Sequence, residues 1–201
     1  KGNINGKVSS IEHTTSAPGV HPAVVLTPGQ STTTTLTFNA ALTDPETAAY
    51  VCLEKTEGLT LPTAEEILRD GKAIAQTGDI LVENLKPSTT YVIAAAVTNT
   101  GIYSEVNSIV MATGTPTPVV TLTAGATAPT TLTFTVGLAD TEKAAYVCLE
   151  KADGTPVPTA EKILTDGTAI AQAGEITVDN LKDGTTYVIA VAASNKEVYS
   201  E

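Results

Sequence analysis

The run Asn84-Leu85-Lys86-Pro87-Ser88-Thr89-Thr90-Tyr91-Val92-Ile93-Ala94-Ala95-Ala96-Val97 decides the fold, because it returns at residues 180–193 with 10 of its 14 positions identical. The likeness extends outward from this run. Residues 22–105 and 118–201 align without a gap, and 51 of the 84 aligned positions are identical. Solenoid repeats are only about 20–50 residues long, so a duplication of this length predicts two copies of a whole domain.

Composition narrows the classes of partner. The chain carries 22 acidic and 11 basic residues, a formal charge of −11. It has no basic cluster for a phosphate backbone, which argues against nucleic acid as a partner. No apolar run approaches the roughly 18 residues of a membrane span, so the chain is expected not to span a membrane. Abundant Thr and the absence of Trp favour a β-rich extracellular module.

Each copy is expected to be mainly β. Residues 33–42 alternate, placing Leu36, Phe38, Ala40 and Leu42 on one face of a half-buried strand. Residues 23–27 predict an earlier strand that ends at Pro28-Gly29. Residues 44–46 predict a turn before the apolar strand 48–53.

One short helix is expected in each copy, at residues 62–71 and its counterpart. Thr63 and Glu66 have the spacing of a capping box, and Gly71 predicts a left-handed stop. Lys162 replaces Glu66 in the second copy, so the box should be lost there. The helix is expected to pack Ile67 and Leu68 on a sheet edge.

The run at residues 84–97 resembles the penultimate strand of fibronectin type III domains. The resemblance lies in the alternation of Leu85, Pro87, Thr89, Tyr91, Ile93 and Ala95. In that family the Tyr forms a corner, with its hydroxyl bonded to upstream backbone. The resemblance implies this role for Tyr91 and Tyr187. The helix and the strand before it resemble immunoglobulin-like repeats of Bacteroidetes surface proteins.

The expected fold is therefore all-β, with two tandem fibronectin type III-like (Ig-like) β-sandwiches that each carry one short helix. Residues 22–115 should form the first domain. Residues 116–201 should form the second, which lacks its last strand. Residues 1–21 are expected to be an extended segment that resembles a spare last strand.

No catalytic or metal-binding constellation is expected. His13 and His21 lie outside the copies, so no Cys–His or Ser–His pair can form within one. Cys52 and Cys148 occupy equivalent apolar strands and are expected to be small, buried and reduced. The chain is predicted not to be an enzyme and to need no cofactor.

A ligand site at one pole of the sandwich is a further candidate. The loops there carry Asp44, Glu46, Tyr103 and Glu105. Loops at a sandwich pole often bind ligands. Tyr103 and Tyr199 are the only tyrosines expected to be exposed, which leaves few platforms for a sugar ring. Solvated turn residues are the alternative interpretation.

The two copies differ in whether a candidate last strand follows them. Residues 106–113 follow the first copy as an extended run, and residues 8–18 match residues 106–116 at five of eleven positions. The segment before the first copy is thus a candidate strand donor. The candidate donor residues are Val8, Ser10, Ile11, Glu12 and His13, and the acceptor edge in the second copy is Tyr187, Ile189, Val191 and Ala193.

Two explanations of this difference stay open. Residues 16–21 reach at most about 20 Å, less than the roughly 30 Å of an intervening domain, so a donor would have to come from a neighbouring molecule. Head-to-tail donation would build an open fibre. Alternatively, the 201 residues are part of a longer array in which a later segment closes the second domain. Glu12 and His13 stand where the first copy has Val110 and Met111, which weighs against donation.

The sequence therefore favours a non-catalytic structural or adhesive repeat protein at the cell surface or outside the cell. Its expected partners are other copies of itself, joined head to tail, or further repeats of the same chain, together with a surface glycan or protein. The alternative is a spacer or carbohydrate-binding accessory module of a larger glycan-handling surface protein.

Overall fold

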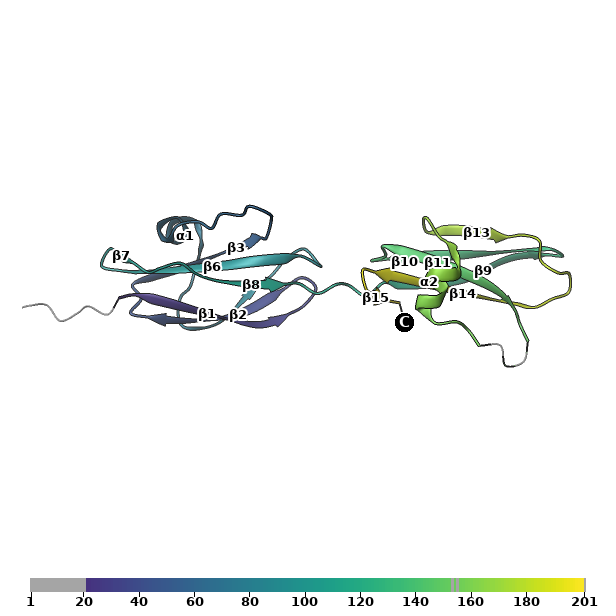
Figure 1. The fold of residues 1–201 in the computed structure, drawn as a ribbon, viewed down its shortest axis with the longest axis horizontal. Coiled ribbons are helices and arrows are strands. Elements are labelled where there is room, and N and C mark those ends of the chain that lie inside the picture. The colour runs from purple at the N-terminus through teal and green to yellow at the C-terminus, as the bar shows by residue number, and fades with distance from the viewer. Residues whose placement is uncertain (1–20, 153, 155, 201) are drawn as a thin grey trace, which may run out of the picture. The chain divides into compact units, whose positions relative to one another are not determined.

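A computed structural model of the chain describes residues 21–152, 154 and 156–200, which divide into two compact units (Figure 1). Each repeat forms two β-sheets of its own. The described residues therefore confirm the all-β prediction, with one short helix in each repeat.

The first repeat is a complete sandwich. One sheet has the order β1-β2-β5, and the other has the order β4-β3-β6-β7, with β8 also paired to β6. The bounds are β1 (Ala23–Ser31), β2 (Leu36–Thr43), β3 (Thr47–Glu54), α1 (Ala64–Asp70), β4 (Lys72–Ala73), β5 (Gly78–Val82), β6 (Thr90–Asn99), β7 (Ile102–Tyr103) and β8 (Asn107–Ala112).

The second repeat copies this plan without a described equivalent of β8. Its sheets have the orders β13-β10-β9 and β12-β11-β14-β15. The bounds are β9 (Val119–Ala128), β10 (Thr131–Ala139), β11 (Lys143–Glu150), α2 (Ala160–Asp166), β12 (Thr168–Ala169), β13 (Gly174–Val178), β14 (Tyr187–Asn195) and β15 (Val198–Tyr199).

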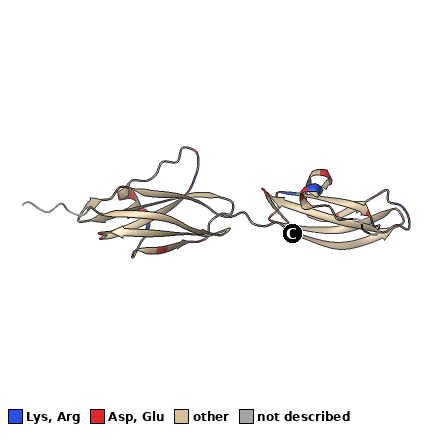
Figure 2. Cartoon of the chain, turned by 60° about the horizontal axis from the view of Figure 1, so that its bottom comes forward, with Lys and Arg blue, Asp and Glu red and all other residues tan. Residues whose placement is uncertain are grey.

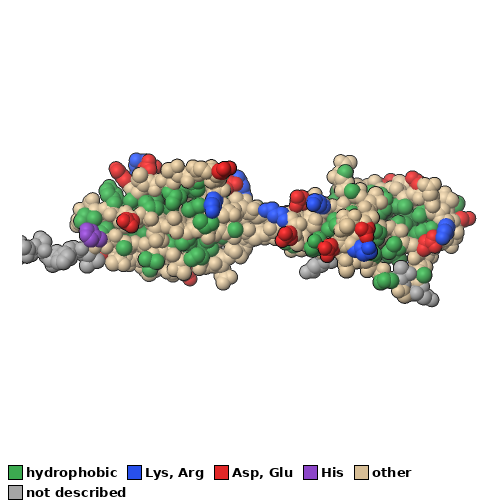
Figure 3. Space-filling model, viewed as in Figure 1, with side chains coloured by type: hydrophobic (Ala, Val, Ile, Leu, Met, Phe, Trp, Pro, Cys, Tyr) green, Lys and Arg blue, Asp and Glu red, His purple; other side chains and the backbone are tan. Residues whose placement is uncertain are grey.

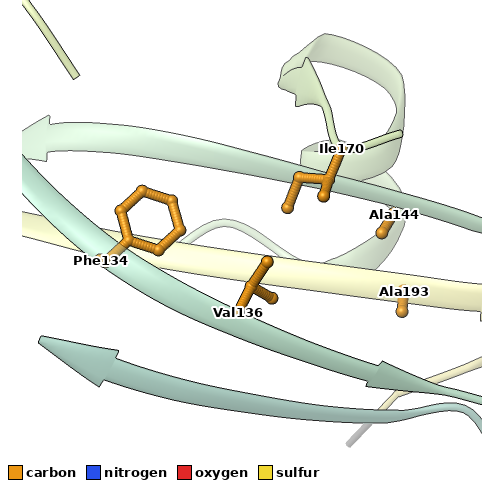
Figure 4. Close-up of a cluster of buried hydrophobic side chains, with 5 residues drawn as sticks. All are labelled: Phe134, Val136, Ala144, Ile170 and Ala193. Carbon is orange, nitrogen blue, oxygen red and sulfur yellow. The ribbon is translucent and has the colours of Figure 1, made fainter. Parts of the chain in front are cut away.

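The core of each repeat lies between its two sheets. Leu36, Phe38 and Ala40 are fully buried on one face of β2, as the alternation predicts. Phe38 meets Tyr50 of the opposite sheet edge to face, with ring centroids 5.2 Å apart. Such pairs stabilise by about 1 kcal/mol beyond the area they bury. In the second repeat, Phe134, Val136, Ala144, Ile170 and Ala193 form the buried cluster (Figure 4).

The helix lies where predicted, but its end and its packing differ. Thr63 and Glu66 form the capping box, and in the second repeat Thr159 caps α2 while Lys162 pairs with Asp166 instead. The predicted left-handed stop is wrong, because Gly71 has φ −78°. Glycine is needed there for space, since a Cβ would lie 2.3 Å from the Ile67 carbonyl oxygen.

The helix covers a sheet face, so the predicted packing on a sheet edge is wrong. Ile67 is fully buried against Ala49 of β3 and Ala94 and Ala96 of β6. These small side chains leave room for the helix on the outer face of the sheet (Figure 1).

The first strand is longer than predicted. Pro28-Gly29 does not end it, and β1 runs on to Ser31. The strand lies at the edge of its sheet, where a missing N–H is tolerated. In β9 the register shifts opposite Leu132 and Phe134, which marks an irregularity at the equivalent place.

Most charged side chains lie outside the strands. Figure 2 shows the strands almost entirely tan, with Lys, Arg, Asp and Glu mainly in the loops and helices. Apolar side chains are nevertheless visible over the strands of both repeats in Figure 3. None of the described helices is long and apolar enough to cross a membrane.

Candidate functional site

The corner before the penultimate strand is built alike in both repeats. The Lys86 amide donates to the Tyr91 hydroxyl at 2.9 Å, and the Lys182 amide donates to the Tyr187 hydroxyl at the same distance. Each Tyr therefore anchors the loop before its strand, which confirms the role implied by the resemblance. Both strands enter their sandwiches from an equivalent, fixed corner.

In the first repeat, β8 closes the sandwich beside this corner. The Thr113 amide donates to the Thr89 carbonyl at 3.0 Å, and the Ser104 amide donates to the Val97 carbonyl at 2.8 Å. Residue numbers thus rise on one strand as they fall on the other, so β8 runs antiparallel to β6. Asn107 also binds β1, through a 3.0 Å bond from the Leu26 amide to its Oδ1.

Closure by β8 buries the apolar side chains beneath it. Leu26 and Tyr91 are each 6% exposed, and Leu36 and Ile93 are fully buried. These four residues come from both sheets of the first repeat. Their exposure in the closed first repeat can be compared with that of the equivalent residues of the second repeat, 96 positions later.

The equivalent position in the second repeat is open. Leu122, the counterpart of Leu26, is 46% exposed. Leu132, Tyr187 and Ile189 are half-buried, whereas their counterparts are buried. Identical side chains thus differ in exposure because no described strand of the second repeat takes the place of β8.

The opening forms a groove of two adjoining hollows. The larger is about 330 Å³ and is lined mainly by apolar groups, including Leu122, Phe134 and Ile189. The smaller is about 270 Å³ and lies at the tyrosine corner, with Lys182 and Thr185 in its wall. Both hollows are lined by Thr127, Leu132 and Tyr187. We call this combined depression the acceptor groove.

The free edge of β14 runs along the groove. β14 pairs with β11 from Tyr187 to Ser194, and on its other side, among the described residues, it pairs with β15 at Ser194 and Asn195 alone. Ser200 also bonds the Ala193 carbonyl, and the Ala193 amide donates to the Ser200 hydroxyl. Ala193, a predicted acceptor residue, is thus already bonded, whereas Tyr187, Ile189 and Val191 lie on the free part of the edge. The predicted donor residues Val8, Ser10, Ile11, Glu12 and His13 lie outside the described residues.

The predicted ligand loops separate into two groups. Glu46 accepts a hydrogen bond from the Thr100 amide at 2.8 Å, and Asn99 donates to the Asp44 carbonyl. Glu142 repeats the Glu46 bond by accepting from the Lys196 amide at 3.0 Å. These carboxylates hold a turn in each repeat.

Tyr103 and Glu105 line a different feature. They border a hollow of about 460 Å³ together with His21, and neither Asp44 nor Glu46 lines it. Tyr103 is 49% exposed and Tyr199 is 44% exposed, so both rings are accessible as expected.

The cysteines and acidic groups form no metal-binding cluster within the described residues. No group of three or more His, Cys, Asp or Glu residues lies close enough there to hold a metal ion. Cys52 and Cys148 were expected to be buried and are half-buried, and both are free thiols. Burial raises the pKa of each thiol.

The fold resembles a known tandem module. The chain is similar to a two fibronectin type III domain segment of chicken tenascin, with a TM-score of 0.51 and 13% identity, over 88% of this chain and 93% of that one. No family model and no curated protein sequence matches this chain. At this identity the similarity shows the fold alone. The chain is a pair of fibronectin type III-like β-sandwiches.

Sequence reasoning missed two residues that explain the acceptor groove, one in its wall and one at the closed equivalent position of the first repeat. Leu122 lines it on β9, and its alignment with buried Leu26 could have indicated this. Thr113 is 5% exposed in the first repeat and binds the corner through its side chain. Its match with Thr15 was visible in the sequence, but its role needed the structure.

Proposed function

We propose that this protein is a non-catalytic structural and adhesive repeat protein that acts outside the cell and joins head to tail. Residues 7–15 of one molecule would add as the last strand of the second repeat of the next. One observation carries the proposal. The same apolar side chains that β8 buries in the first repeat lie in an open groove in the second.

Strand addition suits this groove for two reasons. The free edge of β14 offers backbone donors and acceptors from Tyr187 to Val191, and an exposed edge is a template for another strand. The apolar side chains that line the groove can then contact every second side chain of the incoming strand. Because donor and acceptor are different surfaces, each junction leaves one donor and one acceptor unused at its ends, and repetition without ring closure gives a linear polymer.

The extracellular setting rests on composition and resemblance. Thr-rich, Trp-free sandwiches suit extracellular modules, and the likeness to immunoglobulin-like repeats of Bacteroidetes surface proteins points the same way. Partners would be other copies of the chain or further repeats, with a surface glycan or protein as the adhesive target.

A complementation experiment tests assembly. Ile11→Glu should inactivate the donor, and Leu122→Glu should inactivate the acceptor without disturbing a packed core, since Leu122 is 46% exposed. Sedimentation velocity should show an open series of sizes for the unmodified chain and a monomer for each variant. A 1:1 mixture should contain dimers, because one junction can still form.

Two results would refute head-to-tail donation. One is an unmodified chain that stays monomeric at high concentration. The other is a variant that still polymerises while its circular dichroism matches that of the unmodified chain. Deletion of residues 1–15 supplies a control, because β8 closes the first repeat from within and its unfolding transition should not change.

A glycan-binding accessory module is the second candidate. It is favoured by the exposed Tyr103 ring beside the hollow that His21 and Glu105 also line. Glycan-array binding that is lost in Tyr103→Ala, with assembly unchanged, would favour this function. Tyr199→Ala is the matched control in the second repeat.

A further inference from the structure

The first repeat shows which residues a strand must bring to the acceptor groove. Along β8 and the residue after it, Ile109 is half-buried, Met111 is 8% exposed and Thr113 is 5% exposed. The residues between them face solvent, and Val110 is 52% exposed. Alternate positions of the strand therefore face inward, as the period of two requires.

The inward position at Thr113 is a polar anchor. Its hydroxyl donates to the Lys86 carbonyl at 2.6 Å and accepts from the Thr89 amide at 3.0 Å. Its own amide donates to the Thr89 carbonyl. Thr113 thus bonds the carbonyl of Lys86, the same residue whose amide donates to the Tyr91 hydroxyl.

The second repeat keeps the corner but has no described counterpart of Thr113. Tyr187 anchors the Lys182 amide as before. Lys182 and Thr185, the equivalents of Lys86 and Thr89, line the smaller hollow of the acceptor groove. In the first repeat the Thr113 hydroxyl bonds the carbonyl of Lys86 and the amide of Thr89, and Lys182 and Thr185 carry the same two backbone groups at the equivalent positions.

Residues 8–18 satisfy this template at an offset of 98. Ile11 and Thr15 match Ile109 and Thr113, and both are inward positions. Glu12 matches Val110, which is 52% exposed, so its carboxylate would remain in water and its charge does not oppose docking. His13 would replace Met111. Ser16 would replace Gly114, where a Cβ meets no atom nearer than 3.7 Å.

We infer that a neighbouring copy docks in one register, with Ile11, His13 and Thr15 facing into the acceptor groove and the Thr15 hydroxyl bound at the corner of Lys182 and Thr185. This inference rests on the proposed strand addition and specifies which residues of the added strand the groove recognises. Ser10, Glu12 and Thr14 face solvent in this register. The Thr15 hydroxyl would select this alignment, because a slip of one residue turns every side chain to the opposite face.

A chain segment following residue 201 in a longer protein is the competing occupant. The Ser200 amide donates to the Ala193 carbonyl as Ser104 donates to Val97, and in the first repeat that bond leads into β8. Such a segment would block the groove against a second copy. Its presence is therefore an outcome that the test must separate.

The test measures binding of synthetic peptides of residues 7–18 to the chain lacking residues 1–15, with hydrogen exchange reporting on the amides of Tyr187, Ile189 and Val191. The unmodified peptide should bind and protect these amides. Ile11→Glu should weaken binding more than about 100-fold, because a carboxylate would be placed against the apolar side chains of the groove. Glu12→Val, its outward-facing control, should change binding by less than about threefold.

Two further peptides test the role of the Thr15 hydroxyl. Thr15→Val keeps the shape but loses the hydroxyl, and should weaken binding roughly fivefold to tenfold. Thr15→Ser should restore most of this loss. His13→Met, which copies Met111, should tighten binding.

The outcomes separate the register from the assembly. If Glu12→Val strengthens binding strongly while Ile11→Glu is tolerated, the strand docks one residue out of register and the inference is wrong, although strand addition stands. If no peptide binds and the full chain does not assemble, both are wrong. If a form extended beyond residue 201 has the amides of Tyr187, Ile189 and Val191 protected without peptide and binds none, the occupant is the chain's own continuation and both proposals are overturned.

Discussion

The open groove makes a quantitative prediction about two equivalent leucines. Leu26 and Leu122 occupy the same position in the two repeats, yet they are 6% and 46% exposed. The same Leu→Ala substitution should therefore have unequal effects on the free energy of unfolding. The comparison is best made in the chain lacking residues 1–15, so that assembly does not contribute.

The expected difference follows from burial. Removing the extra carbons of a buried Leu loses about 2.4 kcal/mol of transfer free energy at roughly 0.8 kcal/mol per carbon. Leu26→Ala adds a cavity term, so its total should be about 3 kcal/mol, within the range measured for buried leucines. Leu122 is about half in contact with water already and encloses no cavity, so its substitution should cost about 1 kcal/mol.

Urea unfolding followed by hydrogen exchange and mass spectrometry can assign each transition to its repeat. The first repeat should lose about 3 kcal/mol in Leu26→Ala, and the second about 1 kcal/mol in Leu122→Ala. A saturating peptide of residues 7–18 should raise the cost at Leu122 towards the value at Leu26. Equal losses without peptide would refute the open groove, because they would mean that Leu122 is buried in solution.

Three further predictions test local features of the fold. Cys52 and Cys148 should react slowly with a thiol reagent at neutral pH and quickly on unfolding, because burial raises the pKa of both thiols; immediate labelling of the native chain would contradict this. Gly71→Ala should destabilise the first repeat by on the order of 1–3 kcal/mol, because its Cβ would lie 2.3 Å from a carbonyl oxygen, whereas Gly114→Ser should be tolerated in thermal melts. The hydrogen bonds from Thr63 lower the pKa of Glu66, so the Glu66 carboxylate should stabilise the first repeat fully above the ordinary Glu pKa, and this stabilisation should be lost as the pH falls through the lowered value. Glu66→Gln should therefore flatten this part of the pH dependence of the first repeat's melting temperature. An unchanged profile would count against the capping box.

Much of each sandwich could be predicted from local patterns. The alternation at residues 33–42 identified β2 and its buried face, because a strand repeats every two residues. The Thr63 and Glu66 spacing placed the helix start. The end of α1 was not predictable in the same way, because Gly71 is needed for its distance from Tyr50 and Ile67 and not for a positive φ.

The difference in strand number between the two repeats could also be predicted from the sequence, because the duplication and the likeness of residues 8–18 to residues 106–116 are visible without coordinates. Which side chains the groove exposes is decided only by the tertiary structure. The sequence shows the same Leu at positions 26 and 122, and only the packing of β8 against β1 and β6 makes one buried and the other accessible. The same holds for Glu12: its match to Val110 looked unfavourable until the structure placed Val110 on the solvent side of β8. Composition and spacing determine which side chains are available, but burial depends on which strands meet in space.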